Sequence, residues 1–218
     1  MSEKQKRELE KRFYSFKIRN KDSETEGEKI IDGRPIVYES KTNLGFFDEI
    51  IAKGALDDAD LTDVRFLVNH DTSMIPLARS RRNNGNSTMQ FSVDDKGMSL
   101  DWVKLDVKNN PTAASLYSAI ERGDIDGMSF MFSVDEEEWD DLESEHPTRI
   151  IKKIGSVVEV SAVTFPAYDA TSINARSKEA LDNARSAVET ARQHQQESVE
   201  TEKELELAKA KYNFKEKY

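Results

Sequence analysis

The sequence predicts a mixed, mainly β fold: a small β-barrel of about seven or eight strands with one or more flanking helices, followed by a C-terminal helical tail. Three observations predict it. Short segments of alternating apolar and polar residues recur between residues 13 and 165, and turn sequences such as Asp32-Gly33 and Asp95-Lys96-Gly97 separate them. Residues 177–218 contain neither proline nor glycine.

The expected strands share short length and strand-forming composition, and they cover residues 13–19, 29–38, 64–68, 88–93, 98–105, 128–134, 149–154 and 157–165. Short strands at this spacing are typical of a closed or nearly closed barrel. One helix is expected among them, because Asn110-Pro111 can begin it and Gly123 can end it.

The composition divides the chain into three parts. Residues 1–12 form a charged extension, and residues 13–176 form the barrel domain. Residues 177–218 are rich in Ala, Glu, Lys and Gln, which favours helix. The 3–4 apolar spacing that begins at Leu181 is interrupted from Gln195 onward. We therefore expect a solvated or weakly associating helix, with docking against a partner as the alternative.

Two charged segments interrupt the barrel sequence. Residues 135–145 contain eight carboxylates and no basic residue, and we expect a protruding loop that Trp139 holds to the barrel. A cation site is the alternative, but the glycine and ligand spacing of a calcium loop are missing. Arg79, Arg81 and Arg82 form a short basic cluster, which we interpret as a solvated loop or a contact with substrate or partner.

The overall composition excludes several classes of function. A net charge of -10 argues against general nucleic-acid binding. The absence of cysteine removes thiolate metal sites and cysteine nucleophiles. No apolar stretch resembles a secretion signal or a membrane span, so we expect a cytoplasmic protein with no membrane partner. Gly-rich phosphate loops and His-Glu-x-x-His spacing are also missing, so we expect no cofactor and no metal.

Ser129 is the candidate nucleophile. It alternates with Phe130 and Phe132 in the segment Gly127–Phe132, so its hydroxyl is expected to be reachable on the face opposite the large aromatic rings. Gly127 would allow close approach of a backbone or a substrate. Ser161 is the alternative nucleophile if this assignment fails.

His70 is the candidate general base, because it ends the strand expected at residues 64–68. The other histidines, His146 in the acidic run and His194 in the tail, are not held by a predicted strand. A carboxylate is expected to orient the His70 imidazole, and Glu159 is the candidate, with a salt bridge to a barrel Lys or Arg as its alternative role. Asp71 is the rival, although neighbours on an extended strand point to opposite sides.

Four segments together resemble the prohead (capsid maturation) serine proteases of tailed bacteriophages. They are Gly54-Ala55-Leu56, Asn69-His70-Asp71, Gly127–Phe132, and the run from Glu159 to Tyr168, Glu-Val-Ser-Ala-Val-Thr-Phe-Pro-Ala-Tyr. The resemblance extends over about residues 12–176. That family is similar in fold to the herpesvirus maturational proteases called assemblins, whose triad lies on the outside of a β-barrel.

The resemblance implies a function and its residues. His70 would be the general base, Ser129 the nucleophile and Glu159 the group that orients His70. The substrates would be scaffold or the scaffold-like arm of the major capsid protein, and the protease itself, inside the prohead in the host cytoplasm, without a cofactor. The sequence departs from the family at residues 75–79, where many members have a glycine, so we assign no oxyanion-hole residue.

Two other functions remain open. A non-enzymatic capsid assembly or scaffold protein could keep the same fold without turnover, and a β-barrel binding module with no capsid role is the third hypothesis. Covalent labelling of Ser129 by a fluorophosphonate separates the enzyme from both.

Overall fold

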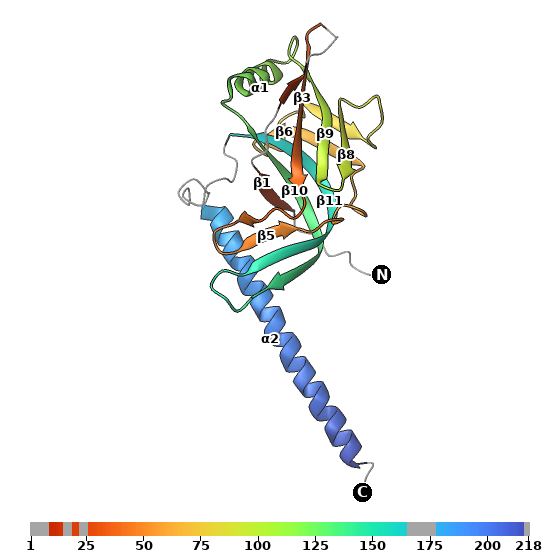
Figure 1. The fold of residues 1–218 in the computed structure, drawn as a ribbon, viewed down its shortest axis with the longest axis vertical. Coiled ribbons are helices and arrows are strands. Elements are labelled where there is room, and N and C mark those ends of the chain that lie inside the picture. The colour runs from red at the N-terminus through yellow and green to blue at the C-terminus, as the bar shows by residue number, and fades with distance from the viewer. Residues whose placement is uncertain (1–8, 15–18, 22–25, 165–177, 216–218) are drawn as a thin grey trace.

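The computed structural model of this chain describes residues 9–14, 19–21, 26–164 and 178–215. The fold is mainly β, with 45% of residues in strands and 22% in helices. Two sheets form the body of the molecule, and the described residues include two helices (Figure 1). The helix α1 lies at one end of the body, and the long helix α2 projects from the other end.

The larger sheet has seven strands and carries the predicted site residues. Its path is β1-β10-β11-β5-β4, with β6 paired to β11 and β7 paired to β6. The strands are β1 (Glu10–Tyr14), β4 (Thr42–Asn43), β5 (Asp48–Ile51), β6 (Asp63–Val68), β7 (Ala78–Arg81), β10 (Gly127–Asp140) and β11 (Thr148–Val163). The length of β11 allows β5 to pair with its first residues and β6 with its last, both in parallel.

The smaller sheet has four antiparallel strands in the order β2-β3-β9-β8. They are β2 (Arg19–Lys21), β3 (Glu28–Val37), β8 (Met89–Asp94) and β9 (Gly97–Asp106). One buried cluster includes apolar side chains of both sheets, among them Ile31, Ile36, Phe66, Met89, Leu100, Phe130 and Phe132. Burial of these side chains is the main force that joins the sheets.

Helix α1 begins and ends where its sequence indicates. The α1 helix (Pro111–Arg122) starts after Asn110, whose side chain accepts hydrogen bonds from the backbone N–H groups of Thr112 and Ala113. Gly123 ends it with φ 78°, a left-handed conformation that glycine adopts without strain. The α2 helix (Lys178–Lys215) contacts the body through Arg192, which donates hydrogen bonds to the carbonyls of Leu142 and Ser144.

The prediction of a closed barrel is wrong, because neither sheet closes. The edges of the two sheets approach each other where the Thr88 N–H donates to the Arg79 carbonyl at 3.1 Å, but β7 and β8 form no ladder. The strands expected at 149–154 and 157–165 are one continuous strand, β11. Strands β4, β5 and β7 were not predicted, since the two to four residues of each are too few to show alternation.

Both charged segments also differ from expectation. Strand β10 continues to Asp140, so the first half of the acidic run is a strand and only its second half turns toward β11. The ring of Trp139 packs edge-on against Phe47 at 5.0 Å between centroids. Arg79 and Arg81 belong to β7 and not to a loop, because β7 pairs with β6.

Candidate active site

The predicted site residues come from neighbouring strands of the larger sheet. In the antiparallel pair β10–β11, Ser129 lies opposite Ser161, and Met131 lies opposite Glu159. Paired residues and residues two apart share a face of a sheet, so Ser129, Ser161 and Glu159 project to the same side. This side is opposite to the one that carries Phe130 and Phe132 into the core.

His70 reaches the same side through a tight turn after β6. Strand β6 runs parallel to β11 with Val68 beside Ala162, so it ends near the serines. Asn69 and His70 then adopt left-handed backbone conformations, with φ 51° and 57°. Such conformations are uncommon for residues other than glycine and persist only where surrounding contacts hold them.

Asn69 supplies several of those contacts. Its backbone N–H donates to the Ala162 carbonyl at 2.9 Å, and its side-chain oxygen accepts from the Thr164 N–H at 2.9 Å. Its side-chain amide donates to the Thr164 hydroxyl at 3.0 Å. The turn is therefore bound to the end of β11, and the imidazole of His70 is held over the sheet.

Ser129, His70 and Glu159 form a continuous hydrogen-bonded chain. His70 Nε2 lies 2.6 Å from Ser129 Oγ, and His70 Nδ1 lies 2.5 Å from Glu159 Oε1. In the tautomer that places the proton on Nδ1, the ring donates to Glu159 and its free Nε2 accepts from the Ser129 hydroxyl. This arrangement can activate a hydroxyl as a nucleophile and stabilise the imidazolium that forms.

Ser161 is a fourth residue of this hydrogen-bonded group. From the sequence it was predicted only as an alternative nucleophile. Its hydroxyl donates to Glu159 Oε2 at 2.5 Å and accepts from the backbone N–H of His70 at 3.1 Å. Both of these hydrogen bonds go to His70 or Glu159 and not to Ser129. The shared face of Glu159 and Ser161 was visible in the sequence, but the contact with the His70 backbone depends on the left-handed turn.

The remaining candidates lie elsewhere. The Asp71 carboxylate accepts hydrogen bonds from the side chain and backbone of Ser73, which hold its pKa below the ordinary value. Within the described residues, it has no hydrogen bond or ion pair with His70. His146 lies between Asn43 and Asp48, at 3.2 and 2.9 Å.

Glu159 itself bonds to His70 and Ser161, and within the described residues it makes no salt bridge to a Lys or Arg, which was its alternative role. His194 is exposed on α2.

The expectation that the Ser129 hydroxyl is reachable is wrong for this conformation. Ser129 has no exposed surface, and Glu159 is 2% exposed. Strands β1 and β11 flank β10 on both sides, and neighbours on the same face, such as Met131, Leu67 and Val163, are also buried. Strand alternation identifies the face of a side chain but does not reveal what covers that face.

The described residues contain no group of three His, Asp or Glu side chains arranged to hold a metal ion. Neither described helix has the length and apolarity that a membrane crossing requires. The segment 165–168 of the run that resembles prohead proteases lies outside the described residues, as does residue 176, where the predicted domain ends.

In comparisons with known proteins, one family model matches this chain. No curated protein and no solved structure matched the chain. The family model of the caudovirus prohead serine proteases matches residues 14–186, which are most of the 218 residues and include Ser129, His70 and Glu159. On this match, the chain belongs to the caudovirus prohead serine protease family.

Proposed function

We propose that this chain is an active serine endopeptidase of the prohead, with Ser129 as nucleophile, His70 as general base and Glu159 as the group that orients His70. Family membership implies a role in capsid maturation, with capsid proteins as substrates, inside the phage capsid in the host cell. The observation that supports activity of this member is the hydrogen-bonded chain from Ser129 through His70 to Glu159.

The reaction follows from these contacts. Ser129 Oγ attacks the carbonyl carbon of the scissile peptide bond while its proton passes to His70 Nε2. The C–N bond then breaks, and His70 returns the proton to the leaving amine. Water, with His70 again accepting a proton, hydrolyses the acyl-enzyme and frees Ser129. Glu159 stabilises the imidazolium in both steps without taking up a proton.

The substrates that we propose are scaffold or the scaffold-like arm of the major capsid protein, and the protease itself. Self-cleavage is expected within α2, because a long helix whose described side chains after Ala191 are mostly exposed unfolds locally more easily than the buried sheet does. Because Ser129 is buried, a peptide bond reaches its hydroxyl only after the surrounding chain moves.

The test is incubation of the purified protein with its own major capsid protein, followed by mass spectrometry of new chain ends. We expect new ends in both proteins with wild type and none with Ser129→Ala. Ser133→Ala is a matched control, since Ser133 is a buried serine of the same strand that contacts Ser156 and not His70. Equal cleavage by wild type and Ser129→Ala would refute the nucleophile assignment.

A non-enzymatic assembly protein on the same fold is the second candidate. The complete burial of Ser129 is the observation that favours it. If the wild-type protein cleaves no capsid protein in assembling proheads and resists a fluorophosphonate, this second function is the correct one.

A further inference from the structure

A cluster of arginines lies beside the predicted triad on the same face of the larger sheet. Arg65 of β6 pairs with Glu159 of β11, and Arg79 of β7 pairs with Arg65, so the three side chains form one row across three strands. Arg81, two residues after Arg79 on β7, projects to the same side, and the exposed Arg82 follows. We call Arg65, Arg79, Arg81 and Arg82 the arginine strip.

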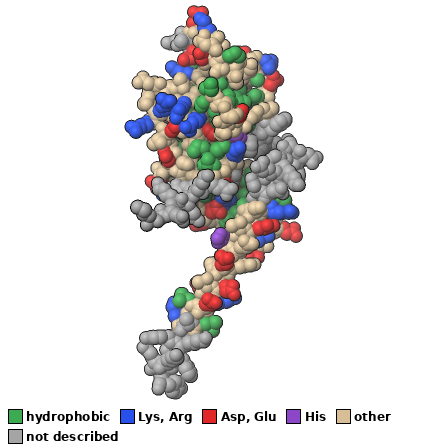
Figure 2. Space-filling view, turned by 180° about the vertical axis from the view of Figure 1, so that it is seen from behind, with side chains coloured by type: hydrophobic (Ala, Val, Ile, Leu, Met, Phe, Trp, Pro, Cys, Tyr) green, Lys and Arg blue, Asp and Glu red, His purple; other side chains and the backbone are tan. Residues whose placement is uncertain are grey.

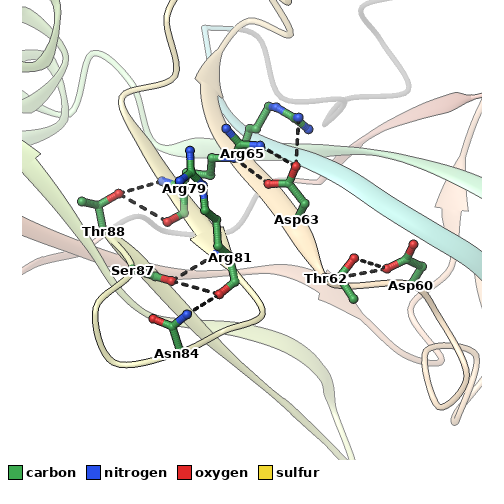
Figure 3. A network of polar contacts seen from close by, with 9 residues as sticks. All are labelled: Asp60, Thr62, Asp63, Arg65, Arg79, Arg81, Asn84, Ser87 and Thr88. Atoms are coloured by element: carbon green, nitrogen blue, oxygen red, sulfur yellow. Dashed lines mark hydrogen bonds and ion pairs between the residues drawn. The ribbon is translucent and has the colours of Figure 1, made fainter.

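One carboxylate is embedded in the arginine strip. Arg79 donates two hydrogen bonds of 2.6 Å to Asp63, and Arg65 donates one of 3.0 Å (Figure 3). The pKa of Asp63 is held below its ordinary value, first by the hydrogen bond from Arg79 and then by the charges of Arg65, Arg79 and Arg81. Asp63 therefore stays ionised and balances only one of the four positive charges.

The other two guanidinium groups are available to a ligand. In the part of the chain that the structure describes, no hydrogen bond is assigned to the side chain of Arg81 or Arg82, and both are exposed. Figure 2 shows Lys and Arg side chains gathered on one flank of the β body. This excess of positive charge contrasts with the net charge of -10 of the whole chain.

The strip is the solvent-accessible rim of the buried site. The side chains of Arg65 and Arg79 are 38% and 33% exposed, whereas that of Glu159 is 2% exposed. Neighbouring strands lie about 4.8 Å apart, so the three spacings from β10 to β7 amount to roughly 14 Å. An extended peptide covers that distance with about four residues.

We infer that the arginine strip binds acidic residues of the peptide substrate, about three to five residues from the scissile bond. This inference rests on the proposed function and adds a substrate preference to it. Guanidinium groups bind carboxylates through paired, charge-assisted hydrogen bonds. A short acidic segment touches only the strip, whereas a long nucleic acid would also meet the acidic remainder of the surface.

The first measurement is binding to the Ser129→Ala protein, because it does not depend on turnover. The probes are a fluorescein-labelled Ala/Ser peptide that ends in consecutive glutamates, its twin with glutamines, and a single-stranded DNA of similar charge. We expect the glutamate peptide to bind about twofold to fivefold more tightly than its twin at low salt, as one exposed ion pair would give, and the preference to fall in high salt.

Two variants test whether the preference for the glutamate peptide comes from the arginine strip. Arg81→Ala removes a guanidinium that makes no hydrogen bond in the described structure, so the fold is expected to tolerate it. Arg79→Ala removes a bidentate pair with Asp63. Its matched control is Arg34→Ala, since Arg34 makes an equivalent pair with Asp94 at 2.7 Å in the other sheet. We expect both strip variants, and not the control, to lose the preference.

The outcomes separate this inference from the proposed function. Equal binding of the two peptides, or a preference that survives in Arg79→Ala and Arg81→Ala, overturns the inference. Tighter binding of the DNA than of the glutamate peptide also overturns it and indicates a nucleic-acid surface. If the wild-type protein prefers the acidic peptide but cleaves no peptide, the arginine strip is a docking surface and only the proposed function is refuted.

A different observation carries a second inference, that Ser161 is a positioning residue for the same reaction. Its hydroxyl holds the carboxylate of Glu159 and the backbone N–H of His70 at the same time. Ser161 has no exposed surface, so water does not replace either bond when the hydroxyl is removed. Its loss therefore releases both the strained turn at His70 and the carboxylate that orients the ring.

Ser161→Ala tests this role. We expect kcat to fall about tenfold to a hundredfold with little change in KM, and Ser161→Thr, which keeps a hydroxyl, to recover part of the loss. The low-field NMR resonance of the proton between His70 and Glu159 should move in Ser161→Ala. Ser156→Ala is the control, because Ser156 lies on the same strand and its hydroxyl bonds to Ser133 and not to the site residues.

The NMR measurement keeps the inference testable without turnover. An unchanged kcat together with an unchanged resonance in Ser161→Ala refutes the role. A resonance that moves equally in Ser156→Ala also refutes it, because the effect would then come from general loosening of β11.

Discussion

A buried glutamate lies at each end of the β10–β11 pair, Glu159 of β11 at one end and Glu49 of the neighbouring β5 at the other, and the two carboxylates have different partners. At one end Glu159 bonds to His70 and Ser161. At the other end Arg149 of β11 bonds to Glu49 at 3.2 Å, to Glu10 and to Glu137, and Glu49 has no exposed surface. One strand pair therefore supports two buried charge clusters.

The partner of each glutamate decides what its cluster can do. Burial alone would lower the pKa of Arg149, but the hydrogen bonds of Glu10 and the charges of Glu49 and Glu137 raise it well above the ordinary value. Arg149 therefore never releases a proton and can only hold strands together. An imidazole can accept and return a proton near neutral pH, so the His70 end can perform chemistry.

Ser129→Ala should have the largest effect on activity. It removes the attacking oxygen while leaving Phe130 and Phe132 in the core, so we expect proteolysis to fall by about 10⁵-fold or more. The free energy of unfolding should fall by about 1–3 kcal/mol, because the buried Nε2 of His70 loses its partner. Capsid-protein cleavage and thermal unfolding, measured on the same samples, check both expectations. Cleavage near the wild-type rate would make Ser161 the next candidate nucleophile.

His70→Ala should be almost as damaging, and the double variant with Ser129→Ala should be scarcely worse than either change alone. Residues that act as one unit show such non-additive effects. The measurement is kcat/KM for the two single variants and the double variant. Losses that multiply would show that His70 contributes to packing or binding and not to proton transfer.

Glu159→Gln should retain measurable activity, reduced about a hundredfold to ten-thousandfold. Gln keeps the shape, but its amide can donate to the ring and favour the wrong tautomer. Asp71→Asn is the comparison, because Asp71 bonds to Ser73 and is exposed. The kinetics of the two variants decide which carboxylate orients His70. A large loss of activity in Asp71→Asn with full activity in Glu159→Gln would assign that role to Asp71.

Arg149→Ala should have the smallest effect on chemistry and a large effect on stability. It leaves several buried or half-buried carboxylates without their cation, which costs about 3–5 kcal/mol of unfolding free energy. Denaturant unfolding measures that loss, and the activity per folded molecule should stay near the wild-type value at low temperature. A loss of activity without a loss of stability would show that the two clusters are coupled.

The sequence predicted much of the site and less of the architecture around it. Alternation along β10 and β11 correctly placed Ser129 on the face opposite Phe130 and Phe132, and Asn110 and Gly123 correctly bounded α1. These features depend on local periodicity and capping. The approach of His70 depends on the parallel pairing of β6 with β11 and on two left-handed residues, which a local pattern does not encode.

The wrong predictions have a common physical origin. Closure of the barrel depends on whether edge strands β7 and β8 form a ladder, and exposure of Ser129 depends on which segments cover its face. Both are contacts between residues far apart in the chain. The acidic run was expected to leave the sheet because like charges repel, but Arg149 and Lys152 on β11 bond to Glu137 and Glu138 across the strand pair.

The most direct test of the account is labelling of the intact protein with a fluorophosphonate, with the modified residue identified by mass spectrometry. We expect one covalent adduct per chain on Ser129, formed in wild type and in Ser133→Ala, strongly slowed in His70→Ala and absent in Ser129→Ala. Activation of Ser129 by His70 requires this pattern. No adduct in wild type, or an adduct on Ser129 whose rate does not change when His70 is removed, would contradict it.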